Sequence, residues 1–255
     1  MTASSLVSQV QTILGLDANR AKAIVQAFDE FVAKPLQANL ARKAGRDLAA
    51  RNPMIYTARG VTAVDEWVKR ALDDWETSAI EGHIGTWMEE VARIASGGFK
   101  PGSGVDLQID RPGTPPTSEL YAIQMAPNTK SAGGRRADVT ALRAAAGALR
   151  AHRRLVELNI GVMHRRAKTA ALGADPNVTV LGSDDFWEKV SGIPDFRARL
   201  VQASAVLSSL VQGRAASEVA RIAAEAKEIF GDAHGNLNLD VLVDPPPAVR
   251  RKKNP

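Results

Sequence analysis

EGHIGTWMEEVARIASGGFKPGSGVDLQID, residues 81–110, continues into RPGTPPTSELYAIQMAPNTK, residues 111–130. The apolar residues of the first segment recur at helical spacing up to Gly97. The pattern then changes to the alternation of a half-buried strand over residues 104–110. A turn rich in proline leads into a second apolar strand over residues 120–125. This order predicts a helix followed by a β-hairpin.

The segments on either side of this unit are mostly helical, and their patterns predict an α/β (α+β) protein. We expect a small mixed sheet flanked by helices, with extra helices at the N- and C-terminal ends. Helices are predicted over residues 4–49 (with breaks at Gly15 and Pro35), 63–75, 78–95, 138–154 and 195–230, and from Asp184 with Ser183 as its cap, and further strands over 156–163 and 178–181.

These patterns suggest a division of the chain into four parts. We expect an N-terminal helical region over residues 1–75, a central core over 76–190, a C-terminal helical region over 191–243 and a disordered basic tail over 244–255.

The composition restricts the chemistry that the chain can carry. Hydrophobic residues make up 45% and charged residues 24% of the 255 positions, which is typical of a soluble globular protein. The absence of cysteine excludes disulfides, thiolate catalysis and a cysteine-bound zinc site, and the four histidines are scattered. Any bound metal should therefore be a hard cation held by carboxylates and carbonyls.

Charge and hydropathy indicate where the protein acts and on what. No apolar run approaches the roughly 20 residues of a membrane helix, and the N-terminus lacks the layout of a secretory signal. We therefore expect a cytoplasmic protein with no membrane partner. The formal net charge of +5 favours a polyanionic partner such as DNA or RNA.

A possible hydrolytic site follows from the polar residues of the hairpin and its preceding helix. Asp106 and Gln124 lie on the two predicted strands, and Glu89 follows Gly85 by one helical turn. Hydrolysis of a phosphodiester needs a divalent metal held by oxygen ligands, and these groups meet that need. Each residue also has a simpler role available, because Asp106 suits a turn cap, Glu89 a solvated helix face and Gln124 a surface amide.

Short motifs in this region resemble those of the PD-(D/E)XK nuclease superfamily, particularly type II restriction endonucleases. Gly85-Thr-Trp-Met-Glu89 and Ser103-Gly-Val-Asp106 resemble the helix and the Asp-bearing strand of such enzymes, and Ile123-Gln-Met-Ala-Pro-Asn-Thr129 resembles the end of their next strand. The resemblance covers about residues 75–165. It implies a restriction-endonuclease-like core and cleavage of double-stranded DNA that depends on Mg²⁺.

The sequence departs from this family pattern on the second strand. A glutamate and a lysine should flank one residue there, but the chain has Ala122 and Gln124. The resemblance then implies a metal ligand from the helix, as in some superfamily members, with Gln124 or Lys130 orienting the water. The metal ligands expected on this basis are Asp106, Glu89, Glu81 and Glu90. An inactive nuclease that only binds DNA is the other interpretation.

Basic residues after the hairpin predict a surface for DNA. Three arginines recur at seven-residue steps in the helix that follows the second strand, and arginine suits contacts to phosphate or guanine. A solvated helix face is the alternative. The expected DNA-binding residues are Asn128, Arg135, Arg136, Arg143, Arg150, His164, Arg165 and Arg166.

Three hypotheses of different classes result. The first is a type II restriction endonuclease that acts as a homodimer, because two-fold DNA sites are matched by two-fold protein symmetry, with a cognate DNA methyltransferase as its genetic partner. The second is a catalytically inactive DNA-binding protein on the same fold. The third is a helical scaffolding protein with an incidental β insert.

Overall fold

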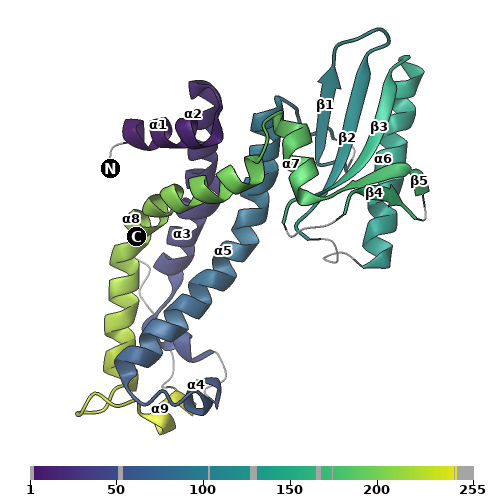
Figure 1. Cartoon of the computed structure of the whole chain (residues 1–255). Helices are drawn as coiled ribbons and strands as arrows, with labels where there is room; N and C mark the ends of the chain where they lie inside the picture. Colours follow the sequence, from purple (N-terminus) through teal and green to yellow (C-terminus); the bar gives the residue numbers. More distant parts are fainter. Residues whose placement is uncertain are drawn as a thin grey trace, which may run out of the picture. The chain divides into compact units, whose positions relative to one another are not determined.

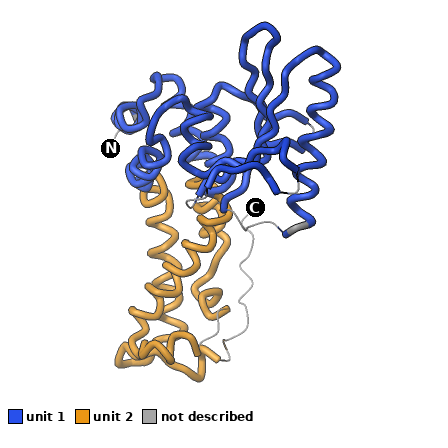
Figure 2. Tube along the Cα trace, turned by 45° about the vertical axis from the view of Figure 1, so that its right-hand side comes forward, with its two compact units in different colours: residues 1–31, 84–209 blue, residues 32–83, 210–255 orange. Residues whose placement is uncertain are grey.

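The computed structural model describes residues 3–50, 54–102, 104–126, 131–164, 168–173, 175–243 and 245. Contacts divide the chain into two compact units, each made from two separate segments (Figure 2). Unit 1 comprises Met1–Phe31 with Ile84–Ser209, and unit 2 comprises Val32–His83 with Leu210–Pro255. The predicted division into contiguous regions stays a prediction, because compactness alone does not show which segments fold independently. Of the predicted basic tail, only residue 245 lies within the described part.

Unit 1 contains the sheet, and two long helices contribute residues to both units (Figure 1). The two long helices are α5, Val64–Ser96, and α8, Phe196–Phe230. The other elements of unit 1 are α1 (Ala3–Leu14), α2 (Ala18–Phe28), β1 (Leu107–Arg111), β2 (Thr117–Gln124), α6 (Ala132–Ala151), β3 (Leu155–Val162), β4 (Ala170–Leu172), β5 (Asp175–Leu181) and α7 (Ser183–Ser191).

Within the part of the chain that the structure describes, five strands form one mixed sheet in the order β1-β2-β3-β5-β4. The predicted hairpin is confirmed, since β1 pairs antiparallel with β2 and Leu107 lies opposite Tyr121. Helix α6 then carries the chain across to β3, which runs parallel to β2 with Gln124 opposite Val162. Strand β5 is parallel to β3, and the short β4 is antiparallel to β5. The predicted fold class is therefore confirmed.

Helices cover the two faces of this sheet. On one face, Leu120 and Ala122 of β2 pack with Leu142 and Ala146 of α6 in a buried apolar cluster. These two α6 residues are four positions apart, so they lie on the same side of the helix.

On the other face, the ring of Phe186 from α7 lies 5.9 Å from that of Tyr121. Gly161 of β3 makes this approach possible, because a Cβ there would lie 2.4 Å from Phe186 Cδ2.

A polar cluster of Tyr121, Glu119 and Arg111 links the two strands of the hairpin on the side of its turn. The Tyr121 hydroxyl donates a 2.7 Å hydrogen bond to Glu119, which also accepts one of 3.1 Å from Arg111. Burial raises the pKa of Tyr121 well above its usual range, and the hydrogen bond to Glu119 raises this pKa further. Tyr121 therefore keeps its hydroxyl proton in the folded protein and donates it to the Glu119 carboxylate in a hydrogen bond.

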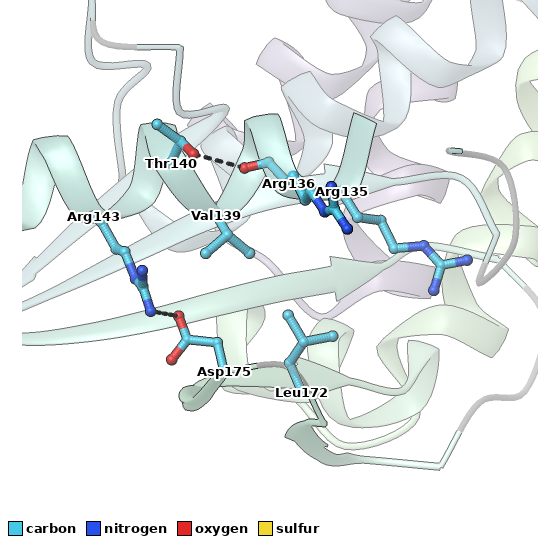
Figure 3. A pocket seen from close by; sticks show the side chains of 7 residues that line it. All are labelled: Arg135, Arg136, Val139, Thr140, Arg143, Leu172 and Asp175. Carbon is cyan, nitrogen blue, oxygen red and sulfur yellow. Dashed lines mark hydrogen bonds and ion pairs between the residues drawn. The ribbon is translucent and has the colours of Figure 1, made fainter. Parts of the chain in front are cut away.

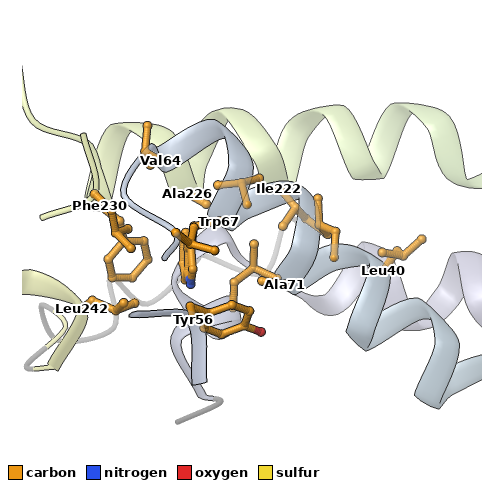
Figure 4. Close-up of a cluster of buried hydrophobic side chains, with 14 of the residues drawn as sticks. Leu40, Tyr56, Val64, Trp67, Ala71, Ile222, Ala226, Phe230 and Leu242 are labelled. Atoms are coloured by element: carbon orange, nitrogen blue, oxygen red, sulfur yellow. The ribbon is translucent and has the colours of Figure 1, made fainter. Parts of the chain in front are cut away.

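Unit 2 is helical and has its own core (Figure 4). The Trp67 ring of α5 packs edge-on against Phe230 of α8, with ring centroids 5.0 Å apart, and against Tyr56 at 6.3 Å. The remaining elements of this unit are α3 (Lys34–Arg42), a 3₁₀ segment (Gly45–Ala50), α4 (Met54–Ala58) and α9 (Leu239–Val243). A π-helical segment over Asp29–Ala33 precedes α3. The predicted break lies here, because α3 begins at Lys34 with Pro35 in its first turn.

The prediction of separate helices over residues 63–75 and 78–95 is wrong, because α5 is continuous. Thr77 and Ser78 do not interrupt it, since their hydroxyls donate to the carbonyls of Asp73 and Asp74 one turn earlier.

Ser183 was expected to cap α7, but Gly182 holds the cap position and Ser183 is the first helical residue. Across the described residues, no helix is both long enough and apolar enough to cross a membrane.

Candidate nuclease site

The aspartate of the hairpin is fixed against β2. Asp106 Oδ2 accepts a 2.7 Å hydrogen bond from the backbone N–H of Ile123, and the Asp106 N–H donates to the Tyr121 carbonyl at 3.0 Å. The side chain is half-buried. Its carboxylate therefore lies beside the C-terminal end of β2 and bonds to that strand, which distinguishes it from a cap of the preceding turn.

The next residue of β2 carries the predicted amide. Gln124 is buried, with 4% of its surface exposed, and its Nε2 donates a 3.0 Å hydrogen bond to Oδ2 of Asp138. Asp138 belongs to α6 and was not among the predicted site residues. It is the one acid in a helix that also carries four arginines. This single acid among basic residues was the sequence feature that could have identified Asp138 as a candidate.

The position where the family pattern expects a strand carboxylate lies inside the apolar core. Ala122 is 2% exposed and packs with Leu120, Leu142 and Ala146. Burying an ionised carboxylate among such side chains is costly, so alanine suits this environment. The apolar packing around residue 122 therefore explains why an alanine, and not an acid, occupies this position.

Helix α5 approaches the same strand end through Gly85. A Cβ on Gly85 would lie 3.5 Å from Sδ of Met125, which directly follows Gln124. This is an ordinary contact distance, so the helix lies near the strand end, but the predicted need for a glycine at this position stays a prediction. Glu89 follows one turn later, with an oxygen 4.0 Å from Lys100 Nζ.

The other two helix acids lie in different surroundings. Glu90 forms a two-pronged ion pair with Arg93, and Glu81 is exposed and belongs to unit 2. Within the described ranges, no group of three or more acidic or histidine residues is placed to hold a metal ion. The predicted ligand set of Asp106, Glu89, Glu81 and Glu90 is thus not gathered into one such cluster.

Arginines of α6 line a pocket of about 640 Å³ between this helix and the β4–β5 hairpin (Figure 3). Arg143 Nη2 lies 2.7 Å from Oδ2 of Asp175, whose side chain is 4% exposed, whereas that of Arg143 is 60% exposed. The carboxylate thus orients an arginine that remains open to solvent. The lining residues are Arg135, Arg136, Val139, Thr140, Arg143, Leu172 and Asp175.

The remaining predicted DNA-binding residues differ in their exposure and in whether the structure describes them. Arg150 is exposed near the end of α6, and His164 is exposed after β3, where its N–H donates to the Met125 carbonyl at 2.8 Å. Arg154, which was not among the predicted site residues, has a structural role, since its Nε donates to the Ser118 hydroxyl at 2.6 Å. Four predicted site residues lie outside the described part of the chain: Asn128, Lys130, Arg165 and Arg166.

The side chains at the end of β2 include two carboxylates, which are the kind of donor that a hard divalent cation binds. Asp106 and Asp138 bring carboxylates to the consecutive residues Ile123 and Gln124. The Gln124 amide nitrogen faces Asp138, so this amide holds the carboxylate in place and its own oxygen is directed elsewhere. Carboxylate and amide oxygens are the donors that Mg²⁺ prefers.

Comparison with known proteins adds one finding. A family model described as type II restriction endonuclease EcoO109I matches residues 19–208, a span that includes the whole sheet and both carboxylates at the end of β2. No curated protein matches the chain.

Proposed function

Because the chain belongs to the EcoO109I family of type II restriction endonucleases, which are site-specific deoxyribonucleases, we propose that it cleaves double-stranded DNA at a defined sequence with Mg²⁺ as its cofactor. The observation that carries this proposal is the Asp106 carboxylate, held 2.7 Å from the Ile123 N–H at the end of β2. A divalent cation bound there would supply Lewis-acid stabilisation of the charge that develops on phosphate.

The chain's own residues would divide the remaining work. Asp106 would hold the cation, with Glu89, one turn after Gly85 on α5, as the candidate from that helix. Gln124 is neutral, so it can orient groups by hydrogen bonding but cannot offset negative charge as a lysine would. Lys130 remains the proposed source of a nearby positive charge.

The arginine pocket supports a DNA partner. Three arginines line it together with Val139 and Leu172, and guanidinium groups suit contacts to a sugar–phosphate backbone. Recognition of a two-fold symmetric site would require a homodimer. A restriction enzyme also requires a DNA methyltransferase to protect its host, so we expect a gene for one beside the gene for this chain.

Cleavage of unmethylated plasmid and phage DNA by the purified protein tests the proposal. Discrete fragments should appear with Mg²⁺ and disappear with chelator. Asp106→Ala should bind DNA without cutting it, whereas Asp240→Ala, which alters an exposed aspartate in α9, should cut normally. Intact substrate under every divalent metal would refute the enzymatic proposal.

One observation favours a second candidate, a DNA-binding protein without catalysis. Gln124 replaces the expected lysine, and the position of the expected strand acid is the buried Ala122. This candidate predicts salt-sensitive DNA binding with no turnover. Metal-dependent cutting that is lost in Asp106→Ala would eliminate it.

A further inference from the structure

We propose that Asp138 supplies the second carboxylate of the nuclease site, from helix α6 instead of from strand β2. The inference rests on the proposed nuclease function and adds a metal ligand to it. No family pattern quoted above for this chain includes an acid at this place in the helix.

Asp138 lies on the face of α6 that packs against the sheet. It precedes Leu142 by four residues and Ala146 by eight, and both are fully buried against β2. Positions at this spacing share one side of a helix. A purely structural helix would continue this face with an apolar residue, but α6 places a half-buried acid there.

The topology brings this acid to the end of the strand. Helix α6 follows β2 in the chain, so its early turns lie near the C-terminal end of that strand. The resulting contact is the 3.0 Å hydrogen bond from Gln124 Nε2 to Asp138 Oδ2. Asp106 reaches the preceding residue, Ile123, at 2.7 Å. Two carboxylates therefore contact consecutive residues of one strand.

The packing explains why the acid comes from the helix. A carboxylate at residue 122 would point into the cluster of Leu120, Leu142 and Ala146, whereas Asp138 is half-buried. Gln124 then acts as a positioning residue, because its amide nitrogen holds the Asp138 carboxylate in place.

Metal binding by the full-length protein without DNA provides the test. Asp138→Asn keeps an oxygen that accepts the Gln124 hydrogen bond but removes the charge, so a structural role and a ligand role give different results. We expect Asp138→Asn and Asp106→Asn each to weaken Mn²⁺ binding at least about tenfold in calorimetric titration. Asp240→Asn should bind Mn²⁺ as the wild type does, and Asp138→Glu should recover part of the loss.

The outcomes separate this inference from the function on which it rests. Weaker Mn²⁺ binding in Asp106→Asn together with unchanged binding in Asp138→Asn would overturn the role of Asp138 and leave the nuclease proposal standing. Failure of the wild type to bind Mn²⁺ would overturn the role of Asp138 alone, whereas failure to cut DNA under every divalent metal would overturn the nuclease proposal on which it rests. Urea unfolding of Asp138→Asn at the wild-type midpoint would confirm that any loss of Mn²⁺ binding is not a loss of folding.

Discussion

The three arginines of the α6 pocket should set how strongly DNA binding depends on salt. Each phosphate that a protein neutralises contributes about −0.9 to the slope of log K against log salt concentration. Replacement of Arg135, Arg136 and Arg143 by alanine should therefore flatten this slope by up to about 2.7. Arg143 already pairs with Asp175 at 2.7 Å. If this arginine neutralises no phosphate, the other two should still flatten the slope by about 1.8.

This difference is large enough to measure with confidence. Between 50 and 200 mM KCl, a slope difference of about 2.7 means that the wild type loses roughly 40-fold more affinity than the variant. Fluorescence anisotropy with a labelled duplex of about 30 base pairs, without Mg²⁺ so that cleavage is prevented, would give both slopes. Non-specific binding is sufficient for the measurement, because phosphate contacts do not depend on sequence.

A matched triple variant controls for net charge. Lys22→Ala, Arg59→Ala and Lys69→Ala together remove three positive charges from the formal net charge of +5, as the pocket variant does, and all three residues are exposed outside the pocket. The control should keep a slope close to that of the wild type. Equal flattening in both variants would show that overall charge governs binding, and the pocket would lose its assigned role.

Two further predictions concern unit 1. Gly161→Ala should lower the free energy of unfolding by about 1–3 kcal/mol in urea titrations, because its Cβ would overlap the buried Phe186 ring. Gly147→Ala, on open helix surface, should instead raise the free energy of unfolding by up to about 1 kcal/mol. Equal effects of the two substitutions would refute the packing argument. Because the folded state raises the pKa of Tyr121, the stabilisation is complete below the unfolded pKa of about 10 and is lost as the pH rises above it. Above about pH 10, the free energy of unfolding of the wild type should fall with pH, and Tyr121→Phe should reduce this fall by up to about 1.4 kcal/mol per pH unit. An equal fall in the variant would contradict this prediction.

The hairpin and the crossover helix could be predicted because their signals are local. Alternating residues such as Leu107 and Ile109, and a proline-rich turn, are visible in any short window of sequence. Strand β4, Ala170–Leu172, gives no such signal, since its extended form depends on pairing with β5. The continuity of α5 was also missed, because Thr77 and Ser78 are ambiguous in sequence but donate within the helix once it forms.

The candidate site was predictable only in part, for the same physical reason. Asp106 follows from strand alternation and spacing, and its hydrogen bond to β2 agrees with the predicted place on the hairpin. Asp138 and Asp175 gain their importance from partners on other elements, Gln124 and Arg143. Such pairings depend on the three-dimensional path of the chain, which no local window of sequence contains.

The split origin of unit 2 has a consequence for synthesis on the ribosome. Trp67 emerges early, but its core partner Phe230 lies beyond the intervening segment Ile84–Ser209. At roughly 5–20 residues per second, translation from Trp67 to Phe230, roughly 160 residues, takes about 8–33 s. During that interval, the apolar side of the nascent helix around Trp67 has no Phe230 to cover it, so a newly made chain should be a substrate for chaperones that bind exposed apolar segments.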